Sequence, residues 1–342
     1  MILASRALAS ILVTGALTSV AGPLFAQSRE VNVYTYRETK LIQPLFEAFS
    51  KETGIKVNMI SASSGLEQRI TTEGAKSPAD LFLTVDIGRL QDAVKAGISQ
   101  PLKSDVIEKA VPPQFRDANG EWVGLSMRAR VVYASKERVK QDAITYEELA
   151  DPVWKGKVCS RSGQQAYNNA LFAAYIGHYG EEKTEVWLKG LKANLAQKPS
   201  GGDREVARDI AAGKCDIGLG NTYYWALMLN NEPDKKAWAE ATKVILPKFK
   251  EGGTHVNLSG VVLTKHAPNK ANALKLVEWM VGETAQHMYA DANNEYPIRS
   301  GIKPNPTISS YGELKPDTLP IIAIADNKKK ASVLVDKVGF DN

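Results

Sequence analysis

Hydrophobic and polar positions alternate with two different periods along the first hundred residues. Val31 and Val33 lie on one face of the segment 30–36, which has the two-residue period of a strand. Apolar residues then recur at helical spacing up to Phe49, and Gly54 is predicted to end that helix. The same order continues with predicted strands at 55–60 and 81–85 on either side of a helix at 66–73.

A second series of strands and helices follows Trp122. It comprises predicted strands at 131–133, 157–159 and 216–220 and predicted helices at 146–149, 164–179, 187–195 and 206–212. Strands and helices that alternate in this way predict parallel strands joined by right-handed helical crossovers. We therefore expect an α/β fold in which a ligand binds at the carboxyl ends of the strands.

The composition is that of a globular chain with about two domains, since a domain has roughly 100 to 200 residues. The protein has 342 residues, of which 44% are hydrophobic and 24% are charged. Its 43 Lys and Arg residues are nearly balanced by 38 Asp and Glu residues, and no basic stripe is interleaved with aromatic residues. We expect no nucleic-acid partner, and we expect the run Lys328–Lys330 on a solvated face.

Residues 1–26 have the pattern of a bacterial secretory signal peptide. Arg6 precedes an apolar run from Ala7 to Val20, and the small residue Ala26 marks the predicted cleavage point. The apolar run is shorter than the roughly 20 residues that span a bilayer. We therefore expect a soluble mature protein that is exported to the periplasm.

Export also affects the expected chemistry of Cys159 and Cys215, the two cysteines of the chain. An isolated pair in an oxidising compartment favours a disulfide. Each cysteine opens a strand-like run, so adjacent strands would bring the two sulfur atoms together. A metal site is the alternative, although neither a CxxC motif nor a neighbouring histidine supports it.

Three stretches match a family pattern as well as a fold: Thr53–Val57, Ser77–Phe82 and Asn221–Trp225. In these stretches, and over nearly the whole mature chain, the sequence resembles the ferric-iron-binding periplasmic proteins of ABC importers. The resemblance implies a two-lobed fold with a hinge between the lobes, similar to one lobe of transferrin. It also implies a protein without enzymatic activity that delivers Fe(III) to a permease in the inner membrane.

Tyrosine is a residue type that suits such a cargo. Fe(III) is a hard cation that prefers anionic oxygen donors, and a bound metal ion lowers the pKa of its ligands enough to deprotonate a phenol. The adjacent pair Tyr223 and Tyr224 is the strongest candidate. Asn221 and Thr222 are candidate helix N-caps after a strand that ends at Gly220. Because the chain leaves the strand there, both tyrosines are able to face one metal, whereas consecutive strand residues point to opposite faces.

Two further tyrosines complete the predicted ligand set. Tyr167 lies at another strand-to-helix junction, at the start of the long predicted helix. Tyr36 ends the first strand, and we prefer it to Tyr34, which we assign to the wall of the lobe, because Tyr36 is closer to the carboxyl edge. Family members with a ligand in this loop carry it one or two positions later, where this chain has Glu38 and Thr39.

Four phenolates around a trivalent ion leave about one negative charge in excess, so a cation is expected nearby. We assign Arg128 to this role, with Arg130 and Arg37 as reserves. Some members of the family add an anion such as carbonate, and the stretch Ser160–Gln165 is a candidate nest for one. The remaining residues assigned to the surroundings of the metal are Asp203, Asn221 and Glu38.

The sequence contains neither a nucleophile motif nor a phosphate-binding loop, which argues against a hydrolase. The alternative function is a periplasmic binder of an organic or anionic solute such as thiamine, a polyamine or a phosphonate. We expect a monomer whose hinge strands lie near 126–130 and 250–256. The predicted first lobe comprises 27–127 and 252–300, and the predicted second lobe comprises 128–251 and 301–342.

Overall fold

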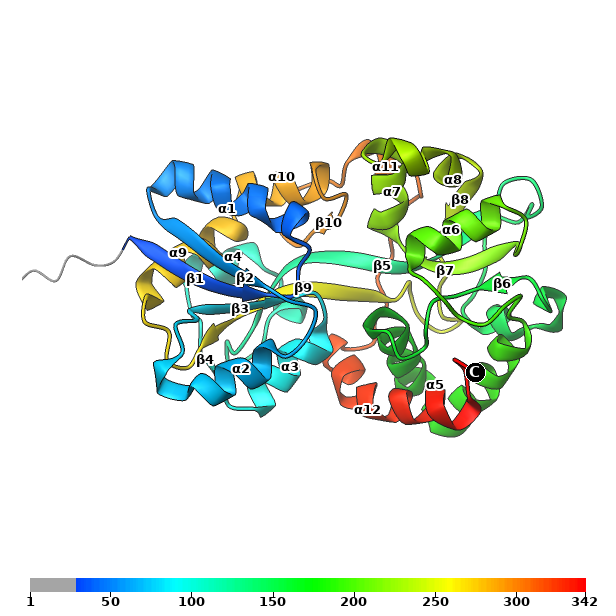
Figure 1. Ribbon diagram of the computed structural model, residues 1–342, viewed down its shortest axis with the longest axis horizontal. Coiled ribbons are helices and arrows are strands. Elements are labelled where there is room, and N and C mark those ends of the chain that lie inside the picture. The colour runs from blue at the N-terminus through cyan, green and yellow to red at the C-terminus, as the bar shows by residue number, and fades with distance from the viewer. Residues whose placement is uncertain (1–28) are drawn as a thin grey trace, which may run out of the picture.

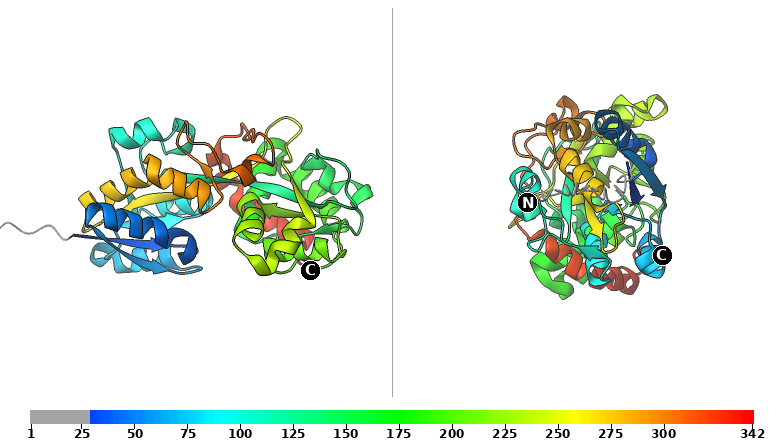
Figure 2. Two further views of the ribbon diagram at one scale, coloured as in Figure 1. Left: turned by 90° about the horizontal axis from the view of Figure 1, so that it is seen from above. Right: turned by 90° about the vertical axis from the view of Figure 1, so that its left-hand side faces the viewer.

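Two long antiparallel strands pass through the middle of the molecule and connect its two lobes (Figure 1). They are β5 (Val123–Ser135) and β9 (Val256–Thr264), in a computed structural model that describes residues 29–342. The predicted signal peptide, residues 1–26, lies outside the described residues. The described chain begins at the outer end of the first lobe and ends in the second lobe (Figure 2).

The sheet of the first lobe is mixed. Strand β1 (Glu30–Thr35) pairs in parallel with β2 (Lys56–Ser61) and with β3 (Leu81–Thr84), as the pattern predicted. Strand β3 then pairs with β9 in the antiparallel direction, so the prediction of parallel strands is wrong at this position. Hydrophobic alternation does not encode strand direction, and β9 enters this lobe from the second one. The other elements here are α1 (Thr39–Thr53), α2 (Leu66–Glu73), α3 (Ile87–Lys95), β4 (Ser99–Gln100), α4 (Asp105–Ala110), α9 (Lys270–Met280), α10 (Glu283–Asp291) and β10 (Tyr296–Pro297).

Strand β5 passes from one lobe to the other between Ala129 and Arg130. Residues up to Ala129 pair with β9, whereas Arg130–Ala134 pair with β7 (Ile217–Asn221) of the second lobe. The other elements here include β6 (Val158–Cys159), α5 (Ala166–Ala193), α6 (Asp203–Ala211), α7 (Thr222–Asn230), α8 (Lys236–Glu240), β8 (Thr242–Ile245) and α11 (Pro306–Ser309). The helix predicted at 146–149 is a 3₁₀ turn, Glu147–Ala150. None of the helices within residues 29–342 has the length and apolar character needed to cross a membrane.

Four of the predicted elements differ clearly in extent from the observed ones. The strand predicted at 131–133 is the middle of β5. Helix α5 merges the two helices that we predicted at 164–179 and 187–195, and it is kinked at Gly180, whose φ of 80° and ψ of 169° are not helical. A glycine adopts a positive φ without the steric cost of a β-carbon, so the helix turns there and continues. The hinge strand predicted near 250–256 begins only at Val256.

The last helix, α12 (Ile321–Val338), packs along α5 and also reaches α3 of the first lobe (Figure 1). Lys328 on α12 lies 2.7 Å from the carboxylate of Asp92 on α3, and Lys330 lies 2.8 Å from Glu181 on α5. The predicted solvated lysine run is therefore partly engaged in ion pairs, one of which joins α12 to the first lobe. The division of the sequence between the lobes stays a prediction.

The predicted disulfide is confirmed. Cys159 at the end of β6 is bonded to Cys215, which lies two residues before β7, and their Cα atoms are 5.8 Å apart. Strands β6 and β7 are parallel neighbours, as the prediction required. The bond therefore ties together the two strands that lead into α5 and α7.

We expect the bond to stabilise the native state by about 2–5 kcal/mol, because it closes a long loop in the unfolded chain. The free energy of unfolding in urea should fall by that amount when the protein is reduced, and by a similar amount in Cys159→Ser/Cys215→Ser. Alkylation of both thiols in the native, unreduced protein would contradict the bond itself.

Candidate functional site

Tyr167, Tyr223 and Tyr224 meet in a small apolar cluster that is separate from the main core. The hydroxyl oxygens of Tyr167 and Tyr223 are 3.3 Å apart, and the ring centroids of Tyr223 and Tyr224 are 4.1 Å apart. Leu41 and Leu227 complete the cluster. The structure therefore brings three of the four predicted ligand tyrosines together.

Local structure at two strand-to-helix junctions places these three side chains. Strand β7 ends at Asn221 and α7 begins at Thr222, so Tyr223 and Tyr224 lie in the first turn of a helix, as predicted. Tyr167 lies in the first turn of α5, where the Gln165 side chain accepts a hydrogen bond of 2.7 Å from its backbone N–H. Both helix N-termini therefore lie at the cluster, and each presents the positive end of its dipole.

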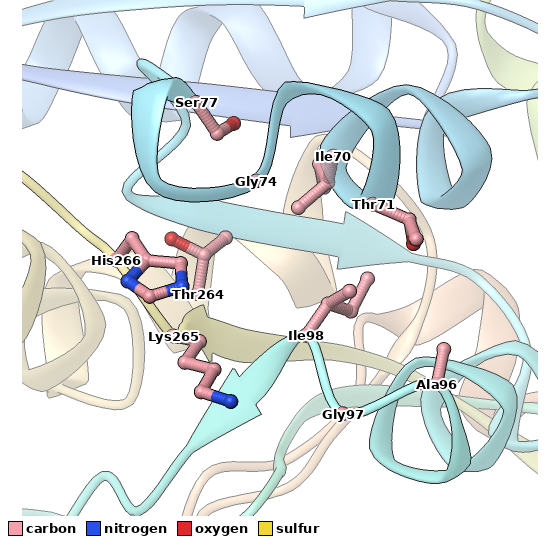
Figure 3. Close-up of a pocket in the computed structure, with 10 residues that line it drawn as sticks. All are labelled: Ile70, Thr71, Gly74, Ser77, Ala96, Gly97, Ile98, Thr264, Lys265 and His266. Atoms are coloured by element: carbon pink, nitrogen blue, oxygen red, sulfur yellow. The ribbon is translucent and has the colours of Figure 1, made fainter.

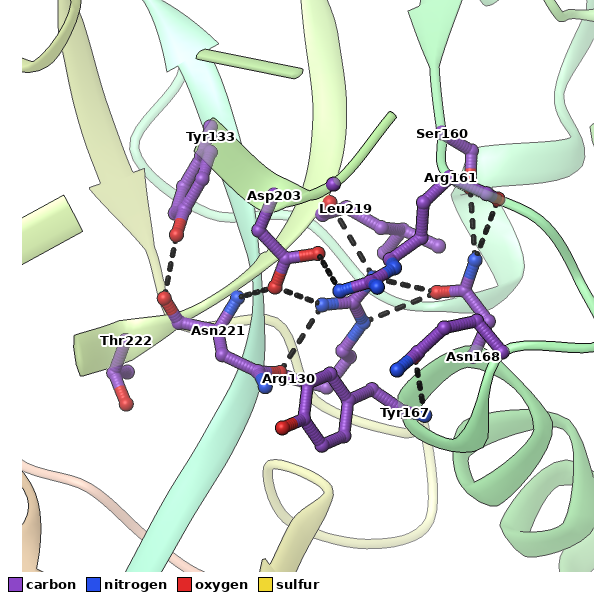
Figure 4. A network of polar contacts seen from close by, with 12 residues as sticks. Arg130, Tyr133, Ser160, Arg161, Tyr167, Asn168, Asp203, Leu219, Asn221 and Thr222 are labelled. Atoms are coloured by element: carbon purple, nitrogen blue, oxygen red, sulfur yellow. Dashed lines mark hydrogen bonds and ion pairs between the residues drawn. The ribbon is translucent and has the colours of Figure 1, made fainter. Parts of the chain in front are cut away.

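A buried guanidinium holds the two junctions in place (Figure 4). Arg130 donates to Asp203 at 2.6 Å, to Asn168 at 2.6 Å and to Asn221 at 3.1 Å. Asp203 also accepts from the backbone N–H of Asn221 at 2.8 Å and from Arg161 at 3.3 Å. Asn221 stands at the N-cap position, as expected, but its side-chain oxygen accepts from Arg130 and not from the helix.

Arg128 is the cation that keeps its charge available to the cluster. Its guanidinium carbon lies 5.5 Å from the Tyr167 ring centroid, and it donates to the Ser259 hydroxyl at 3.1 Å and to the Leu258 carbonyl at 3.2 Å. Among residues 29–342 no carboxylate pairs with it, whereas Arg37 pairs with Glu295 at 2.8 Å. Arg130 pairs with Asp203 at 2.6 Å, a carboxylate that it shares with Arg161, so the two reserve candidates both have buried anionic partners.

Burial raises the pKa values of Tyr223 and Tyr224 well above that of a free phenol. Tyr167 raises both pKa values further, whereas Arg128 lowers the pKa of Tyr223 and the hydrogen bond with Tyr223 lowers that of Tyr224. Burial outweighs these opposing effects, so both phenols are neutral at pH 7 without a bound cation. A cation of high charge would displace their protons.

Two arginines and the two leucines of this cluster, Leu41 and Leu227, were not predicted as site residues. Arg204 lies over the Tyr224 ring at 4.5 Å, and Arg161 lies 5.5 Å from the Tyr167 ring. Leu41 comes from α1 of the first lobe. Arg161 belongs to the stretch considered as an anion nest, and Arg204 adjoins Asp203. Nothing in the local pattern distinguishes Leu41 from the core-facing residues of α1.

Tyr36 is placed differently from the other three tyrosines. Its hydroxyl donates a short hydrogen bond to Glu67 and accepts one of 2.7 Å from the backbone N–H of Leu66. Arg89 lies 4.2 Å from its ring centroid. Burial and Glu67 together raise the pKa of Tyr36 to about 12. Tyr36 therefore faces α2 and α3, and a movement of its side chain would be needed before it bound a metal at the cluster.

Tyr34 and Glu38, two residues before and two residues after Tyr36 in the sequence, have different environments. Tyr34 is buried in the core and donates to Glu73 at 3.1 Å, which agrees with the assignment to the lobe wall. Glu38 is exposed and pairs with Lys40 at 3.5 Å. Its negative charge contributes to raising the pKa of Tyr224, so it is close enough to influence the cluster.

Two larger cavities are lined by residues outside the tyrosine cluster, and one very small space adjoins it. A polar cavity of about 600 Å³ is lined by Tyr36, Arg89 and Lys328, and a cavity of about 150 Å³ near the end of β9 is lined by Ile98 and His266 (Figure 3). A space of only about 10 Å³, about enough for one water molecule, lies between Arg128, Arg130 and Tyr167. The cluster is therefore closely covered in this conformation.

Comparison with known proteins identifies the family of this chain. The family model described as "Bacterial extracellular solute-binding protein" matches residues 36–287. The chain belongs to this family. Iron uptake protein A1 of Synechocystis is 41% identical to this solute-binding protein over 317 residues, which cover 92% of this chain and 88% of that protein.

Solved structures agree with the sequence comparison. The apo ferric ion-binding protein A of Pasteurella haemolytica has a TM-score of 0.88 and 51% identity, and the match covers 92% of this chain and 99% of that one. The ferric binding protein of Bordetella has a TM-score of 0.85 and 56% identity, with 92% and 100% covered. These matches confirm the predicted two-lobed α/β fold of this solute-binding protein.

The buried network around Arg130 yields a stability prediction. Asp203→Asn removes the negative charge that Arg130 and Arg161 share, and an unpaired buried charge typically costs about 3–5 kcal/mol. The free energy of unfolding in urea should fall by about that amount. Asp216→Asn is the matched control, because Asp216 pairs with Arg138 at the partly exposed surface and such a pair contributes about 0–1 kcal/mol. Equal losses in the two variants would contradict the assigned role of Asp203.

Proposed function

We propose that this protein captures Fe(III) in the periplasm and delivers it to an ABC permease in the inner membrane. It acts as a monomeric carrier and not as an enzyme. The observation that carries the proposal is the meeting of Tyr167, Tyr223 and Tyr224 beside Arg128, which has no carboxylate partner among residues 29–342. Iron is the cargo, and the side chains of these tyrosines are its proposed ligands.

The chemistry of the donors favours a ferric ion over a softer or divalent metal. Phenolate is a hard anionic oxygen donor, and three phenolates balance three positive charges. Because burial keeps the phenols of Tyr223 and Tyr224 protonated, the bound cation must have enough charge to displace their protons. Arg128 then offsets the charge of any further anionic ligand.

The relatives support iron rather than the organic or anionic solutes that we considered as the alternative. The protein from Synechocystis is named for iron uptake, and those from Pasteurella and Bordetella are named for binding ferric iron. A protein of Trichodesmium that is 38% identical is described in complex with iron and citrate. These names describe the relatives, and their agreement supports iron as the cargo of this chain.

We further propose that a small anion such as carbonate completes the metal's coordination. The buried atoms Arg128 Nε, Arg161 Nε and Asn221 Nδ2 have no hydrogen-bond partner, and all three are donors that suit an anion. The space beside Tyr167 holds only about one water, so the tyrosines and arginines must separate slightly to admit the anion. Opening about β5 and β9 at the permease would release the cargo.

Replacement of Tyr223 or Tyr224 by Phe removes one donor oxygen and keeps the ring. We expect each variant to bind Fe(III) at least about a hundredfold more weakly, which corresponds to about 2.7 kcal/mol. The measurement is competition with a chelator, followed by the visible phenolate-to-iron absorption. Tyr34→Phe is the control, because the Tyr34 hydroxyl is bonded to Glu73 in the lobe wall. A colourless protein that instead binds thiamine or a phosphonate in calorimetry would reject the proposed cargo.

Tyr36 is proposed as a fourth ligand that binds only after its hydroxyl leaves Glu67 and Leu66. Because those hydrogen bonds must first be broken, Tyr36→Phe should weaken Fe(III) binding less than Tyr224→Phe does. The same competition assay measures both. Affinity equal to that of the unaltered protein would remove Tyr36 from the ligand set, and Glu38 would be tested next.

A further inference from the structure

We infer that Leu41 is the residue through which the first lobe covers the tyrosine cluster and limits the release of the bound ion. This inference rests on the proposed iron site and adds a positioning residue to it. Leu41 belongs to α1, whereas Tyr223, Tyr224 and Leu227, the other buried members of its cluster, all belong to α7 of the second lobe. The cluster therefore joins the two lobes at the proposed ligands.

The burial of Leu41 differs in kind from that of its neighbours on α1. Ile42 and Leu45 are buried in the main core of the first lobe. Leu41 is only 7% exposed, yet it belongs to the separate cluster of tyrosines and not to that core. Its apolar surface is therefore removed from water by the second lobe, and separation of the lobes would expose it.

The backbone at Leu41 is fixed from the side of the first lobe. Its carbonyl accepts a hydrogen bond of 2.9 Å from the side chain of Asn293, which is itself buried. Its N–H donates to the carbonyl of Glu38 at 3.0 Å. Because both backbone groups are bonded within the first lobe, Leu41 moves with that lobe when it separates from α7.

A polar contact flanks the apolar one. Lys40 lies 3.5 Å from Glu232, and Glu232 is bonded to Arg204 at 2.5 Å, whose guanidinium covers the Tyr224 ring. Lys40 is 59% exposed, so water and salt screen its pair with Glu232 strongly. We therefore assign most of the contact between the lobes at this point to Leu41.

An apolar cover has two consequences for a phenolate site. It excludes water, and the lower local dielectric strengthens the attraction between the cation and the phenolates. It also blocks the approach of a competing chelator until the lobes separate. We therefore expect replacement of Leu41 to change the rate of iron release, while the number of donor atoms stays the same and the fold changes little.

Release of Fe(III) to an excess of EDTA, followed by the loss of the phenolate-to-iron absorption, tests the inference. Leu41→Ala should release iron at least about tenfold faster than the unaltered protein, because most of the apolar cover is removed. Leu41→Met, which keeps a similar volume, should release it at nearly the original rate. Leu45→Ala is the matched control: it removes the same atoms from the first-lobe core, so it should lower the melting temperature without changing the release rate.

A measurement on the iron-free protein separates this inference from the proposed function. Nitration by tetranitromethane reports the exposure of tyrosine rings, and peptide mapping assigns it to Tyr223 and Tyr224. Both should be nitrated at least about tenfold faster in Leu41→Ala than in the unaltered protein or Leu45→Ala. Equal nitration, or equal iron release by Leu41→Ala and Leu45→Ala, would overturn the role of Leu41. Failure of the unaltered protein to bind iron, with enhanced nitration in Leu41→Ala, would reject the cargo and retain the cover.

Discussion

The buried charge of Arg130 is the constraint on which the geometry of the site depends. A guanidinium that is 2% exposed requires partners for its hydrogen-bond donors, and these partners come from three different elements. Asn168 lies in the first turn of α5, Asp203 begins α6, and Asn221 ends β7. Tyr167 is next to Asn168, and Tyr223 and Tyr224 are two and three residues after Asn221. Satisfying one buried cation therefore also sets the separation of these phenols.

The disulfide reinforces the same arrangement from the other side. Cys159 ends β6, which leads into α5, and Cys215 precedes β7, which leads into α7. The covalent bond and the Arg130 network therefore act on the same two strand-to-helix junctions. Tyr167 and Tyr223 are held by the second lobe alone, so their relative positions do not depend on closure of the cleft.

The lobes contribute different chemistry to the candidate site. The second lobe supplies the three clustered phenols and the buried network beneath them. The first lobe brings the apolar side chain of Leu41 and the Arg37–Glu295 pair, whose charges cancel. Arg128 lies where β5 crosses between the lobes, and it retains a net positive charge beside Tyr167. The proposed donors on one lobe and the proposed cover on the other would suit a cargo that is bound tightly and later released.

Features that depend on neighbouring residues or on the compartment could be predicted from the sequence. The turn from strand to helix before Tyr223, the position of Tyr167 in the first turn of a helix, and the disulfide between Cys159 and Cys215 all followed from local pattern. Only the tertiary structure decided the antiparallel course of β9, because hydrophobic alternation is the same in both strand directions.

The tertiary structure also decided which charged and polar side chains remain free to act at the site. The sequence favoured Arg128 over the reserves Arg130 and Arg37 only by its position on the predicted hinge strand. In the structure, distant carboxylates pair with Arg37 and Arg130, whereas Arg128 has no such partner among residues 29–342. Tyr36 was assigned by its position at a strand end, yet its hydroxyl is bonded to Glu67, 31 residues away. Pairing between residues far apart in the chain determines which side chains are available, and a local pattern contains no information about those distances.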